Sequence, residues 1–141
     1  TEGGLDVMGN RPLVADAVRR LRDAGISVSL FLDPDEAQID AGAATGADGV
    51  ELHTGAYANA TSPAVLERHL DQLRKSGAYV REAGLALHAG HGLTYRNVQP
   101  VAAIEGMQDL NIGHSIIARS IMVGLEQAVR DMKKLIREAT N

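Results

Sequence analysis

The sequence predicts an α/β protein built around a parallel sheet. Short apolar segments alternate along the chain with longer segments whose apolar residues recur at helical spacing. Two of the short segments end in glycine and histidine just before a helix, at Ala89-Gly90-His91-Gly92 and at Asn111-Ile112-Gly113-His114. Parallel α/β proteins build their sites where the carboxyl ends of strands meet loops and helix N-termini, so both segments indicate a functional site.

The first half of the chain contains two predicted helices and two predicted strands. A helical apolar stripe over Arg11–Ala24 stops at Gly25. Residues 26–32 are β-rich and partly alternating, which predicts the first strand. Asp33-Pro34-Asp35-Glu36 then supplies an N-cap acid, an early proline and an acid at N3, and begins a helix that ends near Gly46. Residues 49–53 are the second strand.

The second half continues the alternation. Ser62-Pro63 caps a helix whose apolar stripe runs to Gly84. The remaining expected elements are a strand at 85–88, a short helix at 97–104, a strand at 110–113 and a long helical stretch at 115–139 with Gly124 as a break.

Four strands with helices between them favour right-handed βαβ units, either as a small open sheet or as half of a (β/α)8 TIM barrel. A complete barrel typically needs about 250 residues, and this chain has 141. We therefore expect residues 1–141 to be a single partial TIM-barrel domain, covering about the C-terminal half. Because the sequence also begins without methionine, in what reads as a mid-domain loop, we expect a fragment. Its open strand edges would favour pairing with another chain.

Composition excludes several classes of function. The net charge is −4 with both signs interspersed, and the only aromatic residues are three tyrosines and one phenylalanine, so a nucleic-acid surface is not expected. The sequence has no cysteine, which suits a cytoplasmic protein. It has neither a signal-peptide pattern at its start nor an apolar run near the roughly 20 residues that cross a bilayer, so we expect no membrane partner.

Glu51 and His53 come at the end of the second expected strand and share a face by the two-residue period, whereas Leu52 points to the other face. A carboxylate inside a barrel strand is costly unless it faces a polar mouth or is paired. Glu51 could stabilise charge on an intermediate or take part in proton transfer. The alternative is a carboxylate that forms a salt bridge between layers.

His91 lies between two glycines that give a ligand close access to the main chain. A histidine on such a loop is suited to donate or accept protons at neutral pH. The alternative is a turn histidine that only binds a nearby carbonyl group. His88, by contrast, falls within the strand and is expected to be a core histidine with its hydrogen bonds satisfied.

Gly113-His114-Ser115 precedes a helix, whose free N–H groups and dipole form an anion site that phosphate usually occupies. The alternative is an ordinary helix start with Ser115 as N-cap. His53, His91 and His114 could in principle share a metal ion. They follow different strands without a compact ligand spacing, so no metal is expected.

Five segments occur in the order of a known family: residues 1–7, Val28–Asp33, Glu51–Ala58, Ala89–Tyr95 and Leu110–His114. Together they resemble pyridoxine 5′-phosphate synthase, an enzyme of bacterial vitamin B6 biosynthesis, over essentially the whole chain. The Gly-His-Gly-Leu-Thr-Tyr and Asn-Ile-Gly-His segments are the most specific.

The resemblance implies a (β/α)8 barrel assembled as a homo-octamer. It implies condensation of 1-deoxy-D-xylulose 5-phosphate with 3-amino-2-oxopropyl phosphate to pyridoxine 5′-phosphate, phosphate and water, with no metal or organic cofactor. Carried over by motif, His91 is the catalytic proton donor and Glu51 stabilises charged intermediates. Gly92 binds substrate, and Gly113 and His114 form a backbone phosphate site.

Part of the family pattern has no counterpart here. The family's N-terminal half supplies an Asn-Asp-His stretch, a catalytic histidine and glutamate, and phosphate-binding arginines, and a binding threonine usually precedes the position of Thr1. We therefore expect this chain to carry about half of an active site and to be inactive alone. We also expect it to bind phosphate weakly, since Arg119 is the nearest arginine after Gly113-His114.

Two other functions are consistent with the pattern. One is a different phosphosugar barrel enzyme, such as an aldolase or isomerase. An imine-forming aldolase is disfavoured because the only lysines, Lys75, Lys133 and Lys134, fall on expected helices. The other is a non-catalytic half-barrel that binds a phosphorylated ligand or a partner half.

Overall fold

The fold is a four-stranded parallel sheet with the strand order β1-β2-β3-β4, seen in a computed structural model that describes residues 3–140. Thr1 and Glu2, which open the first segment of the family resemblance, lie outside the described residues. The strands are β1 (Ser29–Leu32), β2 (Gly49–His53), β3 (Ala86–Gly90) and β4 (Met107–Asn111). The α/β class and the parallel sheet expected from the sequence are confirmed.

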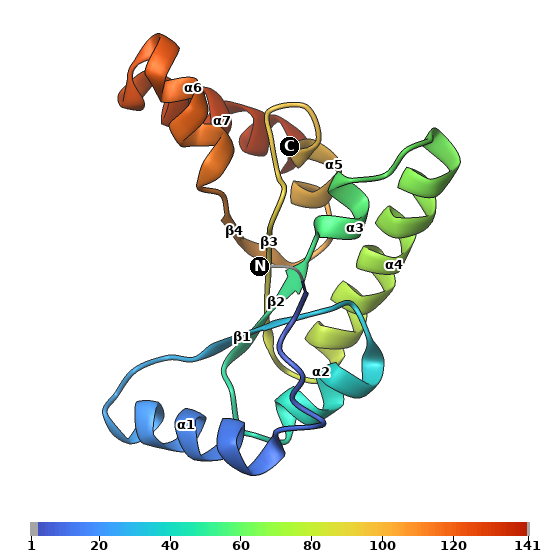
Figure 1. The fold of residues 1–141 in the computed structure, drawn as a ribbon, viewed down its shortest axis with the longest axis vertical. Coiled ribbons are helices and arrows are strands. Elements are labelled where there is room, and N and C mark those ends of the chain that lie inside the picture. Colours follow the sequence, from blue (N-terminus) through green and yellow to red (C-terminus); the bar gives the residue numbers. More distant parts are fainter. Residues whose placement is uncertain (1–2, 141) are drawn as a thin grey trace.

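Seven helices separate or follow the strands in the described part of the chain. Five connect the strands or precede them, and two follow β4. Their bounds are α1 (Arg11–Asp23), α2 (Glu36–Ala43), α3 (Gly55–Ala58), α4 (Pro63–Glu82), α5 (Val98–Ala102), α6 (His114–Val123) and α7 (Leu125–Thr140). In Figure 1, α2 and α4 lie along one side of the sheet, whereas α1 and the α6–α7 pair lie at its two ends.

Several boundaries differ from those expected. Ile26 belongs to the turn after α1, because its N–H donates to the Leu21 carbonyl at 3.0 Å, so β1 begins only at Ser29. The fourth strand lies at Met107–Asn111 rather than at 110–113, and α3 was not expected. The long C-terminal helical stretch divides at Gly124, whose φ of +84° ends α6.

The two faces of the sheet differ in polarity. Leu30, Leu32, Val50, Leu52 and Leu87 are buried on the face that packs against the helices, and they form the centre of the core. Helix α4 contacts both β2 and β3 on this face. The alternation of residues along a strand places the intervening, mostly polar side chains on the opposite face.

His88 lies on the polar face, where it is half-buried rather than a core residue. Its Nδ1 is 3.0 Å from Ser29 Oγ and its Nε2 is 3.5 Å from Asp109 Oδ2. Both ring nitrogens therefore have a polar neighbour, as expected for a histidine with a structural role.

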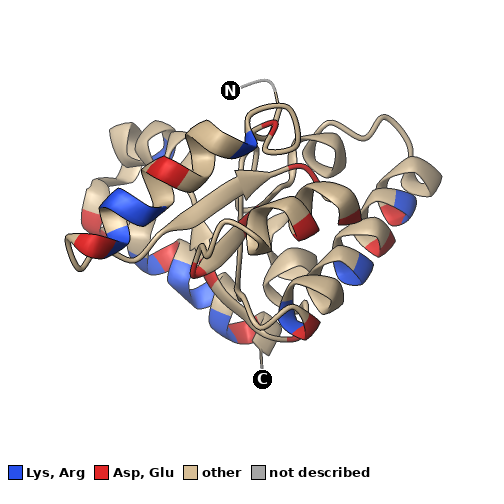
Figure 2. Cartoon of the chain, turned by 90° about the horizontal axis from the view of Figure 1, so that it is seen from below, with Lys and Arg blue, Asp and Glu red and all other residues tan. Residues whose placement is uncertain are grey.

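Charged residues of both signs are intermixed along the outer helices (Figure 2). This distribution agrees with the small net charge of −4. In residues 3–140, no helix combines the length and the apolar character needed to cross a membrane.

Candidate active site

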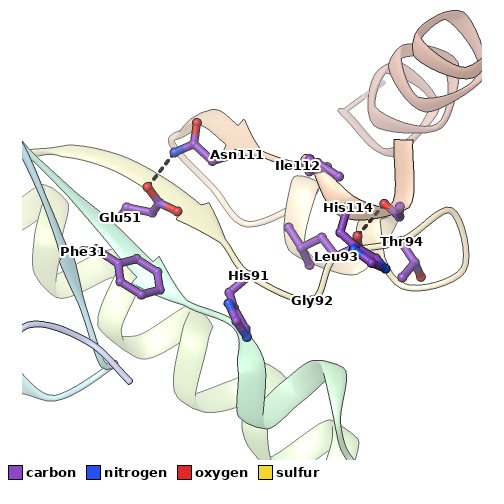
Figure 3. Close-up of a pocket in the computed structure, with 11 residues that line it drawn as sticks. Phe31, Glu51, His91, Gly92, Leu93, Thr94, Asn111, Ile112 and His114 are labelled. Carbon is purple, nitrogen blue, oxygen red and sulfur yellow. Dashed lines mark hydrogen bonds between the residues drawn. The ribbon is translucent and has the colours of Figure 1, made fainter. Parts of the chain in front are cut away.

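A pocket of about 580 Å³ opens beside the carboxyl ends of β2, β3 and β4 and at the start of α6. All five residues proposed from the sequence line it, together with six others (Figure 3). The lining residues are Phe31, Glu51, His91, Gly92, Leu93, Thr94, Asn111, Ile112, Gly113, His114 and Ser115. The fold therefore brings together residues that are up to 84 positions apart (Phe31 to Ser115) in one concave site.

Glu51 projects from β2 on the polar face of the sheet. Its Oε2 accepts a hydrogen bond from Asn111 Nδ2 of β4 at 2.6 Å (Figure 3). Its Oε1 would lie only 2.1 Å from a Cβ atom on Gly90, so the carboxylate rests directly on the β3 backbone. Its partner among the described residues is thus a neutral amide, which does not support a salt bridge between layers.

His91 follows β3 directly and has a φ of +83°, the only positive φ of a described non-glycine residue. Residues other than glycine occupy this region at an energetic cost, and such strain is concentrated at functional sites. The next residue, Gly92, has a φ of +74°, and a Cβ atom there would lie 2.6 Å from Ala58 Cβ. The chain therefore turns sharply here and carries the imidazole to the wall of the pocket.

Thr54, directly after β2, stabilises the turn at His91 through hydrogen bonds. It is fully buried, its N–H donates to the Gly90 carbonyl at 2.9 Å, and its hydroxyl lies 2.7 Å from Gly90 O and 2.5 Å from His91 O. Because a single hydroxyl hydrogen is shared between these two carbonyls, Thr54 ties β2 to the strained segment.

The rest of the loop after β3 is also fixed. Thr94 N–H donates to Asn97 Oδ1 at 2.6 Å, and the Tyr57 hydroxyl donates to the Asn97 carbonyl at 2.9 Å. Burial raises the pKa of Tyr57, with a smaller contribution from Glu67, so its hydroxyl remains a donor at neutral pH. The Tyr95 hydroxyl donates to the Ala128 carbonyl at 2.8 Å and anchors the loop to α7. The loop that forms this wall of the pocket is therefore preformed.

Gly113 caps α6 and His114 is its first residue, so the N-terminal end of this helix opens into the pocket. No atom lies within 4 Å of a Cβ built on Gly113, which leaves its backbone accessible. Ser115 is not the N-cap, because its hydroxyl donates instead to the Leu93 carbonyl at 2.8 Å.

Arg119, one turn into α6, does not reach this end of the helix. It forms an ion pair with Asp131 and stacks on the Tyr95 ring.

His53 lies next to the pocket rather than in its wall. Its Nδ1 is 2.9 Å from Asp33 Oδ1, and its ring packs edgewise on His91 with centroids 4.7 Å apart. Within residues 3–140, no three His, Asp or Glu side chains gather closely enough to hold a metal ion. His53, His91 and His114 are thus not arranged as a ligand set.

Sequence reasoning did not assign a role to several residues that the structure places at the site. Asn111 was visible in the Asn-Ile-Gly-His segment, but its bond to Glu51 spans 60 positions and has no local signature. Phe31 lies on the polar face of the sheet, and the alternation of residues along β1 could have predicted this position. The pairing of Asp33 with His53 likewise depends on tertiary structure.

Comparison with known proteins gives consistent matches. The family model described as pyridoxal phosphate biosynthesis protein PdxJ matches residues 1–138. Pyridoxine 5′-phosphate synthase of Magnetococcus marinus is 59% identical over 139 residues, which cover 99% of this chain and 57% of the relative. The enzyme of that name from Rhodopirellula baltica is 56% identical over 140 residues, covering 99% of this chain and 56% of the relative.

The chain spans a little over half the length of these curated relatives. Among solved structures, a chain in the Amycolatopsis orientalis BexX/CysO complex has a TM-score of 0.63 at 16% identity. The match covers 90% of this chain and 48% of that one. At this identity the likeness concerns the fold alone, whereas the family match extends over nearly every residue. The chain belongs to the pyridoxal phosphate biosynthesis protein PdxJ family.

Proposed function

We propose that this chain supplies one side of the active site of a pyridoxine 5′-phosphate synthase. The reaction condenses 1-deoxy-D-xylulose 5-phosphate with 3-amino-2-oxopropyl phosphate and yields pyridoxine 5′-phosphate, phosphate and water. The observation that carries the proposal is that all five residues matching the family motifs line a single pocket. The relatives named pyridoxine 5′-phosphate synthase are 55–59% identical to this chain, which supports the same activity.

The four-stranded sheet is proposed to form about half of a (β/α)8 barrel. Its polar face, which carries Glu51, His88 and Asn111, fits the lining of a barrel interior better than the surface of an open sheet. The coverage of the relatives agrees, because the chain accounts for 57% of the Magnetococcus marinus enzyme. The other strands and their catalytic groups would come from the remaining length of such a protein.

His91 is proposed to donate protons during ring closure. The reaction passes through an imine, losses of water and an aldol-type addition, so several protons must move within one pocket. A positioned imidazole accelerates such steps by about 10²–10⁴-fold. The strained turn at His91, tied down by Thr54, presents the ring at a fixed place on the pocket wall.

Glu51 is proposed to stabilise positively charged intermediates such as a protonated imine. Because the Asn111 amide orients the carboxylate without neutralising it, the negative charge remains available to substrate. Gly92, Gly113 and His114 are proposed to bind substrate, with a phosphate group at the N-terminal end of α6. Since Arg119 is engaged by Asp131, we expect the isolated chain to bind inorganic phosphate or sulfate weakly, and tight binding by calorimetry would contradict this.

A homo-oligomer, an octamer in the family, is proposed for the assembled protein. The exposed apolar residues of α6 and α7 support self-association, because Ile121 and Met122 are 81% and 84% exposed and Ile117 and Leu125 lie nearby in sequence. Sedimentation equilibrium of the assembled protein tests this proposal.

The activity test measures pyridoxine 5′-phosphate formation from the two phosphorylated substrates. It is run with this chain alone and with the chain co-expressed with the N-terminal part of the Magnetococcus marinus enzyme. We expect product only from the co-expressed pair and its loss in the variants Glu51→Gln and His91→Gln. The matched controls are Glu105→Gln, on an exposed ion pair, and His69→Gln, on α4.

A folded, associated pair that makes no product would contradict the proposed function and favour a non-catalytic half-barrel. Product from the chain alone would contradict the expectation that it is inactive by itself.

A further inference from the structure

We propose that Asp33 and His53 form a positioning pair that holds the His91 imidazole in its working orientation. The proposal rests on the proposed function for its catalytic consequence, but its structural content can be measured without turnover. The pair consists of a carboxylate just after β1 and an imidazole at the end of β2, with His91 following β3. Three consecutive strands thus contribute one residue each to a row that ends at the pocket.

The Asp33 carboxylate fixes the orientation of the His53 ring. Because an ionised carboxylate only accepts hydrogen bonds, the contact of 2.9 Å requires that His53 Nδ1 carries the hydrogen and donates it to Asp33 Oδ1. Asp33 is in turn held by the Gly4 N–H, which donates to the same oxygen at 3.1 Å. A carboxylate that sets the tautomer and angle of an imidazole is a recurrent way to orient histidine.

The His53 ring then supports His91 from the side. It lies between Phe31 and His91, with centroid distances of 5.1 Å and 4.7 Å and edge-to-face geometry in both contacts. Such aromatic contacts add a directional attraction beyond the burial of area. His91 needs this support because its backbone is strained and its side chain follows a sharp turn.

Gly55 provides the room for the two rings to meet. A Cβ atom at this position would lie 2.7 Å from His53 Nε2 and 3.2 Å from His91 Cδ2. Gly55 has no positive φ and is the first residue of α3, so its backbone does not require glycine. The space for the rings is therefore the reason for glycine here.

A purely structural histidine would be expected to satisfy both of its nitrogens. His53 is only 11% exposed, yet its Nε2 is a buried atom with no hydrogen-bond partner in the described chain. Leaving a buried polar atom unpaired costs free energy and calls for an explanation. The contact of the His53 ring with His91 supplies this explanation. Because the ring binds Asp33 on one side and packs against His91 on the other, its Nε2 is left without a partner among the residues that the structure describes.

The first experiment reads the tautomer and the ring contact by NMR of the full chain labelled with 15N-histidine. We expect a hydrogen on His53 Nδ1 that is bonded to Asp33, and we expect the preference for this nitrogen to be lost in Asp33→Ala. The variant Gly55→Ala should shift the ring resonances of both His53 and His91. A His53 hydrogen on Nε2 alone, or unchanged His91 resonances in Gly55→Ala, would overturn the proposal.

The second experiment measures kcat and KM in the co-expressed enzyme. The variant His53→Asn keeps a donor for Asp33 but removes the ring, whereas Gly55→Ala removes no functional group. We expect each to lower kcat by about tenfold or more while KM changes less than about threefold, because binding groups are untouched. Ala56→Gly, an exposed neighbour in α3, controls for helix stability, and His53→Gln replaces His53→Asn if that variant does not fold.

A kcat within twofold of wild type in both folded variants would overturn the positioning role. If the unmodified co-expressed enzyme makes no product, the proposed function fails, and the NMR result still decides whether Asp33 and His53 hold the His91 ring.

Discussion

Asn111 of β4 donates a hydrogen bond of 2.6 Å to Glu51 of β2, across the strand that separates them. The intervening residue is Gly90 of β3, whose missing side chain leaves room for the carboxylate. An amide therefore fixes the carboxylate without cancelling its charge. This arrangement supports the charge-stabilising role proposed for Glu51, because a carboxylate that keeps its charge can attract a cationic group.

The substitution Gly90→Ala should displace Glu51, because the new Cβ would lie 2.1 Å from Oε1. We expect the free energy of unfolding to fall by about 1–3 kcal/mol and the activity of the co-expressed enzyme to fall at least about tenfold. Urea unfolding and steady-state kinetics measure the two effects.

A double-mutant cycle tests the cause. In a Glu51→Ala background, most of the stability cost of Gly90→Ala should disappear. An unchanged cost there would show that contact with the Asn111 carbonyl, at 3.1 Å, is responsible instead.

Two substitutions of His91 separate its backbone strain from the role of its imidazole. The variants His91→Ala and His91→Gly both remove the imidazole, but only glycine adopts a φ of +83° without strain. We expect the glycine variant to be more stable than the alanine variant by about 1 kcal/mol, and both to lose synthase activity. Equal stabilities by urea unfolding would argue against backbone strain at this turn.

Thr54 links the strained turn to β2, and its hydroxyl can be removed at nearly constant shape by Thr54→Val. In this variant the Gly90 carbonyl still accepts a hydrogen bond from the backbone N–H of residue 54, whereas the His91 carbonyl loses its hydroxyl donor. We expect the free energy of unfolding to fall by about 1–3 kcal/mol. Thr54→Ser, which retains the hydroxyl, should recover most of this loss. A serine variant as unstable as the valine variant would assign the effect to packing.

Much of the candidate site could be predicted from local sequence, because the residues that line the pocket lie at strand ends. The two-residue period correctly separated Glu51 and His53 from Leu52, which is fully buried on the helix-covered face. The glycines around His91 indicated an unusual backbone, although the positive φ belongs to His91 and Gly92. Gly90 is required for a different reason, the space occupied by the Glu51 side chain.

The rest of the site depends on contacts that no local pattern encodes. Strand β4 contains Gln108 and Asp109, two consecutive exposed polar residues that resemble loop residues in the sequence. The register shift opposite Leu87 and His88 also interrupts its alternation. The bonds of Asn111 to Glu51 and of Asp33 to His53 join different strands, so only the assembled sheet reveals them.

Acid should weaken the attachment between α6 and α7. Hydrogen bonds from the Arg119 guanidinium, and then from the Gln127 amide, lower the pKa of Asp131 below its ordinary value of 3.8. A lowered folded-state pKa contributes stability above the unfolded-state value, and this contribution is lost as the pH falls through the folded-state pKa. The difference in stability between wild type and Asp131→Asn should therefore be larger at pH 7 than at pH 3. A difference that is equal at the two pH values would contradict this coupling.

Gly113→Ala separates folding from phosphate binding at the N-terminal end of α6. The φ of Gly113 is −112°, and a Cβ atom would meet nothing within 4 Å, so the variant should fold with a free energy of unfolding close to that of wild type. If a substrate phosphate approaches the free N–H groups there, the methyl group occupies part of its path. We expect KM for one phosphorylated substrate to rise about tenfold in the co-expressed enzyme, with a smaller effect on the other. An unchanged KM for both substrates would place the phosphate elsewhere in the pocket, whereas an unfolded variant would contradict the open space beside Gly113.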